Sequence, residues 1–424
     1  MKIGILGGGQ VGQALWNTIY AEKENILNIL GEPLEIKKVL VRDLNKKRDI
    51  PRDFLTNNPD EIIYDKEISL VVEVMGGEEP AHTYIKKALE EQKFIVTANK
   101  EVIALHGDEL YKIARKKGVD IAFEASVGGG IPLIKTIKEA MAVDKVKEIW
   151  AIVNGTTNYI LTKMEEEHRD FEEVLKEAQK LGYAEPDPSK DILGLDTRFK
   201  LAILSSFAHH TTIKPNDIYT EGIEKISLRD IQYAKELGYK IKLLAISKFY
   251  NGEIEVRVHP TMISLSSPLS SVNGVYNAIL LKAEKRGDVL LYGEGAGPYP
   301  TAMALLSDIL EASHTILYSV PRYYSFAYLY PSKIKKSDEI YTRYYMRLWV
   351  KDQPGVLAQI AKILGENNIS ISSVVQKETS EKEGKAELVI LTHKTYEKNM
   401  IKAIKEIKLL PILEEWGSLI RIEG

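Results

Sequence analysis

The sequence contains no cysteine, so disulfide bonds, thiolate zinc sites and cysteine nucleophiles are excluded. It also lacks an excess of charge of one sign, because 57 Lys and Arg residues face 60 Asp and Glu residues and leave a formal net charge of −3. We therefore expect neither nucleic-acid binding nor a membrane-surface patch. No apolar run is long enough to span a membrane, and Met1 leads directly into an expected strand. Both observations favour a cytoplasmic protein without a membrane partner.

The chain of 424 residues, 44% of them hydrophobic, is long enough for two or three globular domains. In its first third, short apolar segments alternate with segments that have helical spacing. This alternation predicts a parallel sheet covered by helices, in an α/β domain over residues 1–125 that a helix at 301–317 completes. The strands are expected at residues 2–6, 36–42, 69–75, 93–98 and 119–125.

A glycine pattern near the N-terminus indicates a dinucleotide site. The stretch KIGILGGGQVGQAL reads as a strand, then G-x-G-x-x-G at Gly7, Gly9 and Gly12 with Val11 inside it, then a helix. Three glycines alone are often only a tight turn, but this pattern lies between a strand and a helix, as a Rossmann-type domain requires. Bare backbone there lets a pyrophosphate approach the free N–H groups of the helix.

The end of the second strand should meet the adenosine ribose, and that strand ends in VLVRD. A carboxylate at this point favours a free 2′-hydroxyl, whereas an arginine favours a 2′-phosphate. Because Arg42 precedes Asp43, we expect NADP(H) and leave NAD(H) open, along with a plain solvated ion pair. The distance from Gly12 to Arg42 exceeds the usual spacing of about 20 residues, which is a departure from the pattern.

The rest of the chain predicts two further domains. Residues 126–300 mix helical and strand-like segments, which indicates an α+β domain, and the tyrosine-rich and polar stretch 318–340 is typical of a linker. Residues 341–424 run strand, helix, strand, strand, helix, strand, the ferredoxin-like βαββαβ order. The predicted fold class is therefore α/β, with a Rossmann-type domain, an α+β domain and a ferredoxin-like domain.

Asp196 and Lys200 lie four residues apart in the segment 187–208, which we predict to be one helix. Asp187 is expected to cap it and Pro188 to take its first position. The helix is apolar nearly all round, so it should be buried. At the surface such a pair is an ion bridge worth a few tenths of a kcal/mol. Buried charges must instead be paired, and a desolvated lysine can exchange protons near neutrality, so we favour a proton-handling pair.

Several segments together resemble the homoserine dehydrogenase family. EPDPSKDILGLDTRFK (185–200) resembles its catalytic signature and NGTTNYIL (154–161) its second signature, while TANKE (97–101) and EASVGGGIP (124–132) match further segments in order. The last 80 or so residues resemble an ACT domain through VKDQPGVLAQIAKIL. The resemblance implies the reversible NAD(P)-dependent interconversion of L-aspartate 4-semialdehyde and L-homoserine in threonine, methionine and isoleucine biosynthesis, by a homodimer or homotetramer that dimerises through the α+β domain.

The resemblance also implies a role for individual residues. Lys200 matches the catalytic lysine that donates a proton to the aldehyde oxygen, and Asp196 matches a residue that binds substrate and supports this lysine. Glu185 matches a ligand of the substrate amino group, and Lys100 matches a second active-site lysine near the nicotinamide. Further cofactor contacts are implied at Thr97, Gly182 and Gly297.

Two smaller sites follow from the same resemblance. A monovalent cation, sodium in the family, would be held largely by backbone oxygens at Glu124, Val127, Gly129 and Ile131, which suits a glycine-rich bend. In the ACT-like segment, free N–H groups at a helix start could receive an amino-acid carboxylate and Asp352 its amino group, with L-threonine as the expected effector. An ordinary capped helix start remains open there. The effector residues would be Asp352, Gly355, Val356 and Leu357.

Other functions were weighed against this one. An acylating aspartate-semialdehyde dehydrogenase would need a cysteine nucleophile, which the chain lacks. Another ACT-tailed dehydrogenase, acting on phosphoglycerate or prephenate, leaves Glu185, Asp196 and Lys200 unexplained. A non-catalytic amino-acid or redox sensor would have no use for Lys100 and Lys200.

Overall fold

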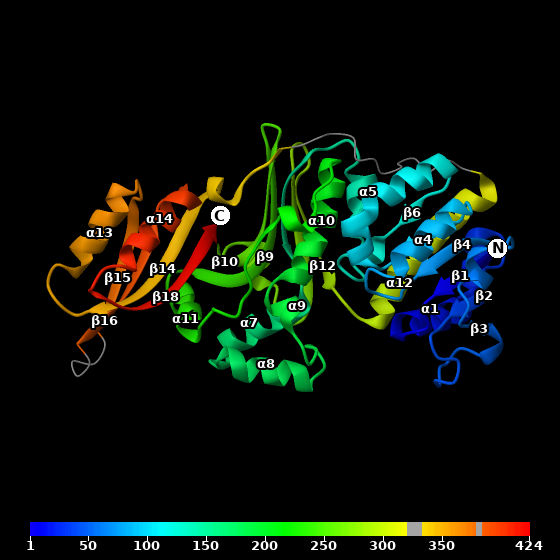
Figure 1. Ribbon diagram of the computed structural model, residues 1–424, viewed down its shortest axis with the longest axis horizontal. Coiled ribbons are helices and arrows are strands. Elements are labelled where there is room, and N and C mark those ends of the chain that lie inside the picture. The colour runs from blue at the N-terminus through cyan, green and yellow to red at the C-terminus, as the bar shows by residue number, and fades with distance from the viewer. Residues whose placement is uncertain (320–332, 379–383) are drawn as a thin grey trace. The chain divides into compact units, whose positions relative to one another are not determined.

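The structure is a computed structural model that describes the chain except for residues 320–332 and 379–383 (Figure 1). Most of the predicted linker at 318–340 therefore lies outside the described residues. The chain divides into two compact units. The first comprises Met1–Ile149, Arg198–Ile218 and Tyr276–Ser332, and the second Trp150–Thr197, Tyr219–Val275 and Lys333–Gly424. Within the described part, no helix has both the length and the apolar character needed to cross a membrane.

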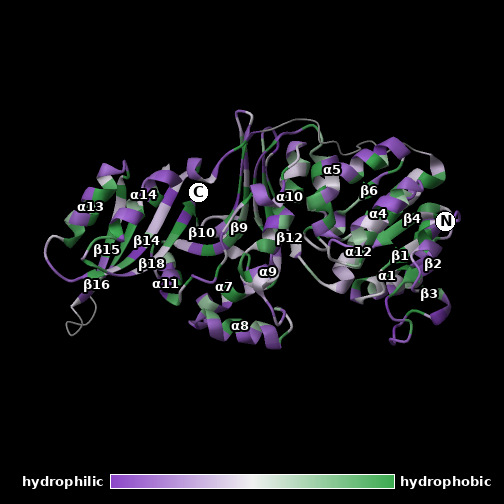
Figure 2. Cartoon of the chain, viewed as in Figure 1, coloured by the Kyte–Doolittle hydropathy of each residue, from purple (hydrophilic) through white to green (hydrophobic). Residues whose placement is uncertain are grey.

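The first unit is built on a parallel sheet with the strand order β3-β2-β1-β4-β5-β6. Its central strands are apolar on both faces, as a sheet covered by helices requires, and Figure 2 shows the hydrophobic colour along β1 and β4. All five predicted strands are confirmed, although the last has two residues where seven were expected. The strands are β1 (Lys2–Leu6), β2 (Glu35–Leu40), β3 (Leu55–Thr56), β4 (Ile68–Glu73), β5 (Phe94–Thr97) and β6 (Ile121–Ala122).

Helices and one antiparallel hairpin complete the first unit. The long helix α12 packs against α1, and its Leu305 and Ile309 join the same buried core as Ile3 and Leu15. A helix from residues 298–318 thus covers a sheet formed by the first 122 residues. The helices are α1 (Gln10–Ala21), α2 (Lys23–Leu30), α3 (Asp60–Ile63), α4 (Ala81–Glu90), α5 (Lys100–Lys117), α6 (Leu133–Lys135) and α12 (Pro298–Tyr318), and the hairpin is β11 (Tyr276–Ala283) with β12 (Gly287–Glu294).

The second unit contains a sheet in the order β9-β10-β18-β14-β16-β15. Its short strands β8 and β13 pair with β10, and β17 pairs with β14, while β7 leads into the unit from the first one. The elements are β7 (Val146–Ile152), α7 (Gly155–Glu167), α8 (Phe171–Lys180), α9 (Ser189–Ile192), β8 (Tyr219–Thr220), α11 (Leu228–Glu236), β9 (Tyr239–Tyr250), β10 (Glu253–Ser264), β13 (Lys333–Ile334), β14 (Tyr341–Lys351), α13 (Val356–Glu366), β15 (Ile371–Glu378), β16 (Lys385–Thr392), β17 (Thr395–Tyr396), α14 (Glu397–Ile407) and β18 (Leu413–Glu423).

The predicted βαββαβ order of the C-terminal segment is confirmed. Alternate residues of β14, such as Tyr344, Met346 and Leu348, point into one core, where they pack with Ile360 of α13 and Ile407 of α14. One edge of this four-stranded sheet is not open, because β18 pairs in parallel with β10 of the same chain. The C-terminal domain is therefore continuous with the rest of the second unit through backbone hydrogen bonds.

The prediction of one helix over 187–208 is wrong. Two helices occupy this segment, α9 and α10 (Leu195–His209), and Gly194 separates them with φ of +77°. That left-handed conformation favours glycine and cannot continue a helix. Pro188 rather than Asp187 takes the cap position, although the Asp187 carboxylate accepts a hydrogen bond from the amide of Ser189 at 3.1 Å. The predicted burial holds for Asp196, which is only 7% exposed.

Candidate active site

The glycine turn after β1 is shaped for close backbone approach. A Cβ added at Gly12 would lie 2.1 Å from the carbonyl oxygen of Gly7, so α1 can close on the turn only because residue 12 is glycine. A Cβ at Gly9, the cap residue of α1, would meet nothing within 4 Å. Gly7 and Gly9 line a cavity of about 450 Å³, whereas Gly12 and Val11 are not among its lining residues. The turn therefore presents open space at a helix N-terminus, which suits a phosphate group.

The far side of the same cavity is basic. Arg42, Asp43, Lys46 and Arg48 all line it, and the first three are exposed. Arg48 donates to the carbonyl oxygens of Gly8 at 3.0 Å and Asp43 at 2.8 Å, so it fastens this loop to the glycine turn. Sequence reasoning missed Lys46 and Arg48, although both lie in the polar stretch directly after β2. The long spacing between the glycine motif and Arg42 comes from α2, an additional helix between α1 and β2.

A buried carboxylate ties together the carboxyl ends of β4 and β5. Glu73 is fully buried and accepts hydrogen bonds from the Thr97 hydroxyl at 2.6 Å, the Asn99 amide at 3.4 Å and the amide of Met75 at 2.7 Å. Burial raises the pKa of Glu73. Asn99 also caps α5, which places Lys100 at the first helical position. The Thr97 hydroxyl is thus engaged in a hydrogen bond to Glu73 within the protein. The sequence analysis did not identify Glu73, an isolated charge within an apolar strand.

A second group of polar residues lies at the start of α7. The side chain of Asn154 caps this helix, accepting from the amide of Thr157 at 2.9 Å. Its amide nitrogen donates to Asp191 at 2.7 Å and to Asp196 at 3.0 Å, so one amide group holds two carboxylates. We call Asn154, Asp191 and Asp196 the Asn154 cluster. Asn154 and Asp191 were missed, although both lie within the two signature segments that drew attention to Asp196.

The loop that carries Gly182 and Glu185 is fastened to the same helix start. The hydroxyl of Thr156, in the first turn of α7, donates to the carbonyl oxygen of Tyr183 at 2.6 Å. Glu185 is exposed, and its carbonyl oxygen accepts from the side chain of Gln179. The structure therefore brings Glu185's loop and the Asn154 cluster to one end of α7, where the helix N-terminus favours negative groups.

Lys100 and Lys200 lie on neighbouring helices of the first unit. Side chains of α5, among them Ile103, and of α10, among them Ala202 and Ile203, line one cavity of about 150 Å³. Lys200 is partly buried and stands one helical turn after Asp196 on α10. Gly297 is the cap residue of α12 in the same unit.

The predicted cation residues lie in the bend after β6. The Glu124 carboxylate accepts amide hydrogen bonds from Leu133, Ile134 and Lys135, the whole of α6. Burial and the neighbouring Asp308 raise the pKa of Glu124 to about 7. Because three amides donate to it, the Glu124 carboxylate is already engaged within the protein. Among the described residues no hydrogen bond ends on the carbonyl oxygens of Val127, Gly129 or Ile131, so backbone oxygens are available to a hard cation.

The predicted effector loop precedes α13. Gly355 is its cap residue with φ of +88°, and Asp352 and Gly355 are exposed. Val356 is buried in the C-terminal core and Leu357 is 39% exposed. Only the backbone of Val356 is therefore accessible to a ligand, while the Asp352 side chain is available.

Comparison with known proteins finds three family models along the chain. A homoserine dehydrogenase model matches residues 132–310, a homoserine dehydrogenase NAD-binding domain model matches residues 7–124, and an ACT domain model matches residues 344–409. The chain is 38% identical to a homoserine dehydrogenase of Bacillus subtilis, covering 100% of this chain and 98% of the relative. It is 42% identical to one of Helicobacter pylori, covering 100% and 99%.

Solved structures agree with these relatives. A homoserine dehydrogenase from Thiobacillus denitrificans superposes with a TM-score of 0.94 at 39% identity, covering 100% of this chain and 98% of that one. A hyperthermophilic archaeal homoserine dehydrogenase in complex with NADPH gives a TM-score of 0.63 at 29% identity, covering 76% of this chain and 98% of that one.

Proposed function

This chain belongs to the homoserine dehydrogenase family, and on that premise we propose how its residues carry out the reversible reduction of L-aspartate 4-semialdehyde to L-homoserine. The observation that carries the proposal is the Asn154 cluster, which holds the buried carboxylate of Asp196. The helix α10 carries Lys200 one turn after Asp196. Family membership sets aside another ACT-tailed dehydrogenase and a non-catalytic sensor.

The chemistry follows from charge development on the aldehyde. Bound NAD(P)H supplies the hydride that adds to the aldehyde carbon. Negative charge then develops on the aldehyde oxygen, where the ammonium group of Lys200 stabilises it and donates the proton. Asp196 supports this lysine and binds substrate, and Glu185 receives the substrate amino group. Lys100, at the start of α5, is the second lysine of the site.

Replacement of each lysine by alanine tests these roles. Lys200→Ala should lower kcat about 10²–10⁴-fold, the usual scale for loss of a general acid, and leave the KM for the cofactor nearly unchanged. Lys100→Ala shows whether the two lysines share the role. Lys116→Ala, an exposed lysine in the last turn of α5, is the matched control and should behave as wild type. A Lys200→Ala enzyme with near-normal kcat would remove Lys200 from proton transfer.

The proposed cofactor is NADP(H). Gly7, Gly9 and Arg42 share one cavity, and Arg42 and Lys46 supply two exposed cations against the single carboxylate of Asp43. This balance favours a 2′-phosphate over a free 2′-hydroxyl. The archaeal relative with NADPH supports the same choice. Thr97, Gly182, Gly297 and Val11 remain predicted contacts, and Gly12 allows the close approach in the turn.

A monovalent cation, Na⁺, is proposed at the bend of Glu124, Val127, Gly129 and Ile131. Three carbonyl oxygens that accept no hydrogen bond from the described residues support this site, and the Glu124 carboxylate shapes it by holding the amides of α6. The cation would stabilise the bend without taking part in hydride transfer.

The ACT domain indicates regulation by an amino acid. We propose L-threonine as the effector, bound at Asp352 and at the backbone amides of Gly355, Val356 and Leu357, which donate to no group in the described part of the chain.

The proposed domains are residues 1–125 with the helix at 301–317, residues 126–300, the linker 318–340, and residues 341–424. A homodimer or homotetramer in the cytoplasm remains a prediction from the family resemblance.

A further inference from the structure

The last strand of the ACT domain carries a buried arginine that is paired in two directions. Arg421 on β18 is 1% exposed. Its guanidinium donates to Glu397 at the start of α14, inside the ACT domain, and to Glu221, just after β8, at 2.8 and 3.2 Å. It also lies 4.8 Å over the ring of Tyr219. A planar guanidinium held by two carboxylates has little freedom to move.

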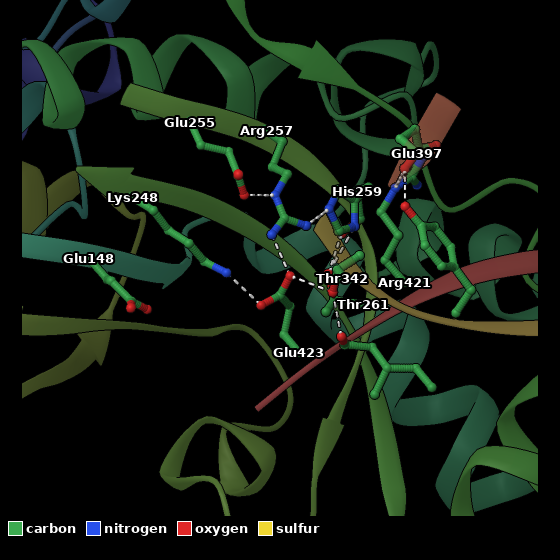
Figure 3. Close-up of polar contacts among 12 residues, drawn as sticks. Glu148, Lys248, Glu255, Arg257, His259, Thr261, Thr342, Glu397, Arg421 and Glu423 are labelled. Carbon is green, nitrogen blue, oxygen red and sulfur yellow. Dashed lines mark hydrogen bonds and ion pairs between the residues drawn. The ribbon is translucent and has the colours of Figure 1, made fainter. Parts of the chain in front are cut away.

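Figure 3 shows the surroundings of this arginine at the junction of β10 and β18. Arg421 and Glu397 lie beside a second buried pair, Arg257 of β10 with Glu423 of β18, and Lys248 reaches Glu423 at 2.7 Å. Glu423 joins the ACT strand β18 to Arg257 of β10 and Lys248 of β9 in the same sheet. Of the three cations, Arg421 is the one with a side-chain ion pair to Glu221, in the segment 219–223, whose residues Tyr219 and Thr220 also pair with β10 through their backbone.

That segment packs on the break between α9 and α10. The amide of Ile223 donates to the carbonyl oxygen of Ile192 at 2.8 Å. A Cβ added at Gly222 would lie 2.1 Å from that same oxygen, so the backbone at Gly222 packs directly against the backbone at Ile192 with no side chain between them. On the other side, the space beside Gly194 is closed by Thr220 and by the carbonyl oxygen of Glu221 at 3.3 Å.

The break itself connects two substrate-site carboxylates. Asp191 immediately precedes Ile192, and Asp196 follows Gly194 by two residues. Asn154 holds both carboxylates from one side, and residues 220–223 support the intervening backbone from the other. A shift of this segment must therefore move the backbone between Asp191 and Asp196.

We propose that Arg421 is a positioning residue for substrate binding, and that the ACT domain acts on the homoserine site through the Arg421–Glu221 pair. The inference rests on the proposed function, because it takes Asp191 and Asp196 to face the substrate. It assigns to a C-terminal residue an effect on homoserine binding and none on cofactor binding. The direct chain of contacts is Arg421, Glu221, Gly222, Ile192 and then Asp191.

Steady-state kinetics of three full-length variants test the proposal. Glu221→Gln keeps the shape of the side chain and removes its charge, and Arg421→Gln removes the fork of donors. Each should raise the KM for homoserine roughly tenfold, within the usual range of coupling between sites, and leave the KM for NADP unchanged. Because both remove the same pair, the double variant should lose little more than either single variant.

Lys248→Gln is the matched control, because it weakens the same junction through Glu423 but does not touch residues 219–223. It should leave the KM for homoserine unchanged. An unchanged homoserine KM in Glu221→Gln would overturn the proposal, as would an equal rise in Lys248→Gln or in the KM for NADP. Glu221 is partly exposed, so its variant keeps the test valid if Arg421→Gln fails to fold. Wild-type enzyme without homoserine-dependent NADP reduction would instead refute the proposed function.

Discussion

Asn154 provides the sharpest test of how the substrate site is assembled. Its side-chain oxygen caps α7, while its nitrogen holds Asp191 at 2.7 Å and Asp196 at 3.0 Å. Asn154→Ser keeps an oxygen that can cap the helix but removes both donors to the carboxylates. Asn154→Asp also keeps the cap and adds a third carboxylate facing the other two.

The magnitude follows from the bonds that are lost. A hydrogen bond to a charged group contributes about 1.5–3 kcal/mol, so losing the equivalent of one such bond in the transition state costs about 2 kcal/mol. That corresponds to about a 30-fold fall in kcat/KM for homoserine in Asn154→Ser. Asn154→Asp should fall further, because like charges repel at short range in a buried site. The KM for NADP should change little in either variant.

The assay is homoserine-dependent NADP reduction, with thermal unfolding measured in parallel. Thr157→Val is the control, because it removes the hydroxyl that donates to Asn154 at 2.9 Å and leaves the two aspartates untouched. It should lose no more than about fivefold in kcat/KM, since one neutral hydrogen bond contributes about 1 kcal/mol or less. Wild-type kcat/KM in Asn154→Ser, or an equal loss in Thr157→Val, would show that Asn154 only caps the helix.

Four further predictions concern the cofactor, the cation, the effector and pH. Arg42→Ala should lower the ratio of kcat/KM for NADP to kcat/KM for NAD. Lys47→Ala is the control and should leave this ratio unchanged, because Lys47 does not line the cavity. An unchanged ratio in Arg42→Ala would show that Arg42 does not recognise the 2′-phosphate. Replacing Na⁺ by choline at constant ionic strength should lower activity, and indifference to Na⁺ would refute the cation site. L-Threonine should inhibit wild type but not Asp352→Ala; inhibition that survives in the variant places the effector elsewhere. Point variants suit this test better than removal of residues 341–424, which would leave buried Asp230 without Arg347. Burial lowers the pKa of Lys242 from 10.5 to about 7. Between pH 7 and pH 10.5 the folded protein therefore binds fewer protons than the unfolded chain. The free energy of unfolding should rise with pH across this range, by at most about 4–5 kcal/mol. Denaturant titrations from pH 6 to 10 should show this rise in wild type and not in Lys242→Met; equal slopes would refute it.

Local sequence was sufficient to predict those parts of the molecule that local physics decides. The parallel strands appear as short apolar runs because both faces of that sheet are buried. The βαββαβ order of residues 341–424 appears as a change between two periodicities, and the glycine turn appears because only glycine permits the approach of Gly12 to Gly7. Burial of Asp196 followed from its apolar helix. The error at Gly194 has the same origin, because an isolated glycine in a helical pattern is tolerated or breaks it depending on what packs there.

Only the tertiary structure decided which distant groups meet. Asn154 reaches carboxylates 37 and 42 residues further along the chain, and Arg421 reaches a glutamate 200 residues before it. No periodicity encodes such contacts, because each depends on where two elements pack and not on the sequence around either one. The sequence does not predict the pairing of β18 with β10 either, because an edge strand has the same backbone donors whether it contacts water or another strand. The residue types at the site were therefore readable from the sequence, while their mutual support was set by packing over long sequence distances.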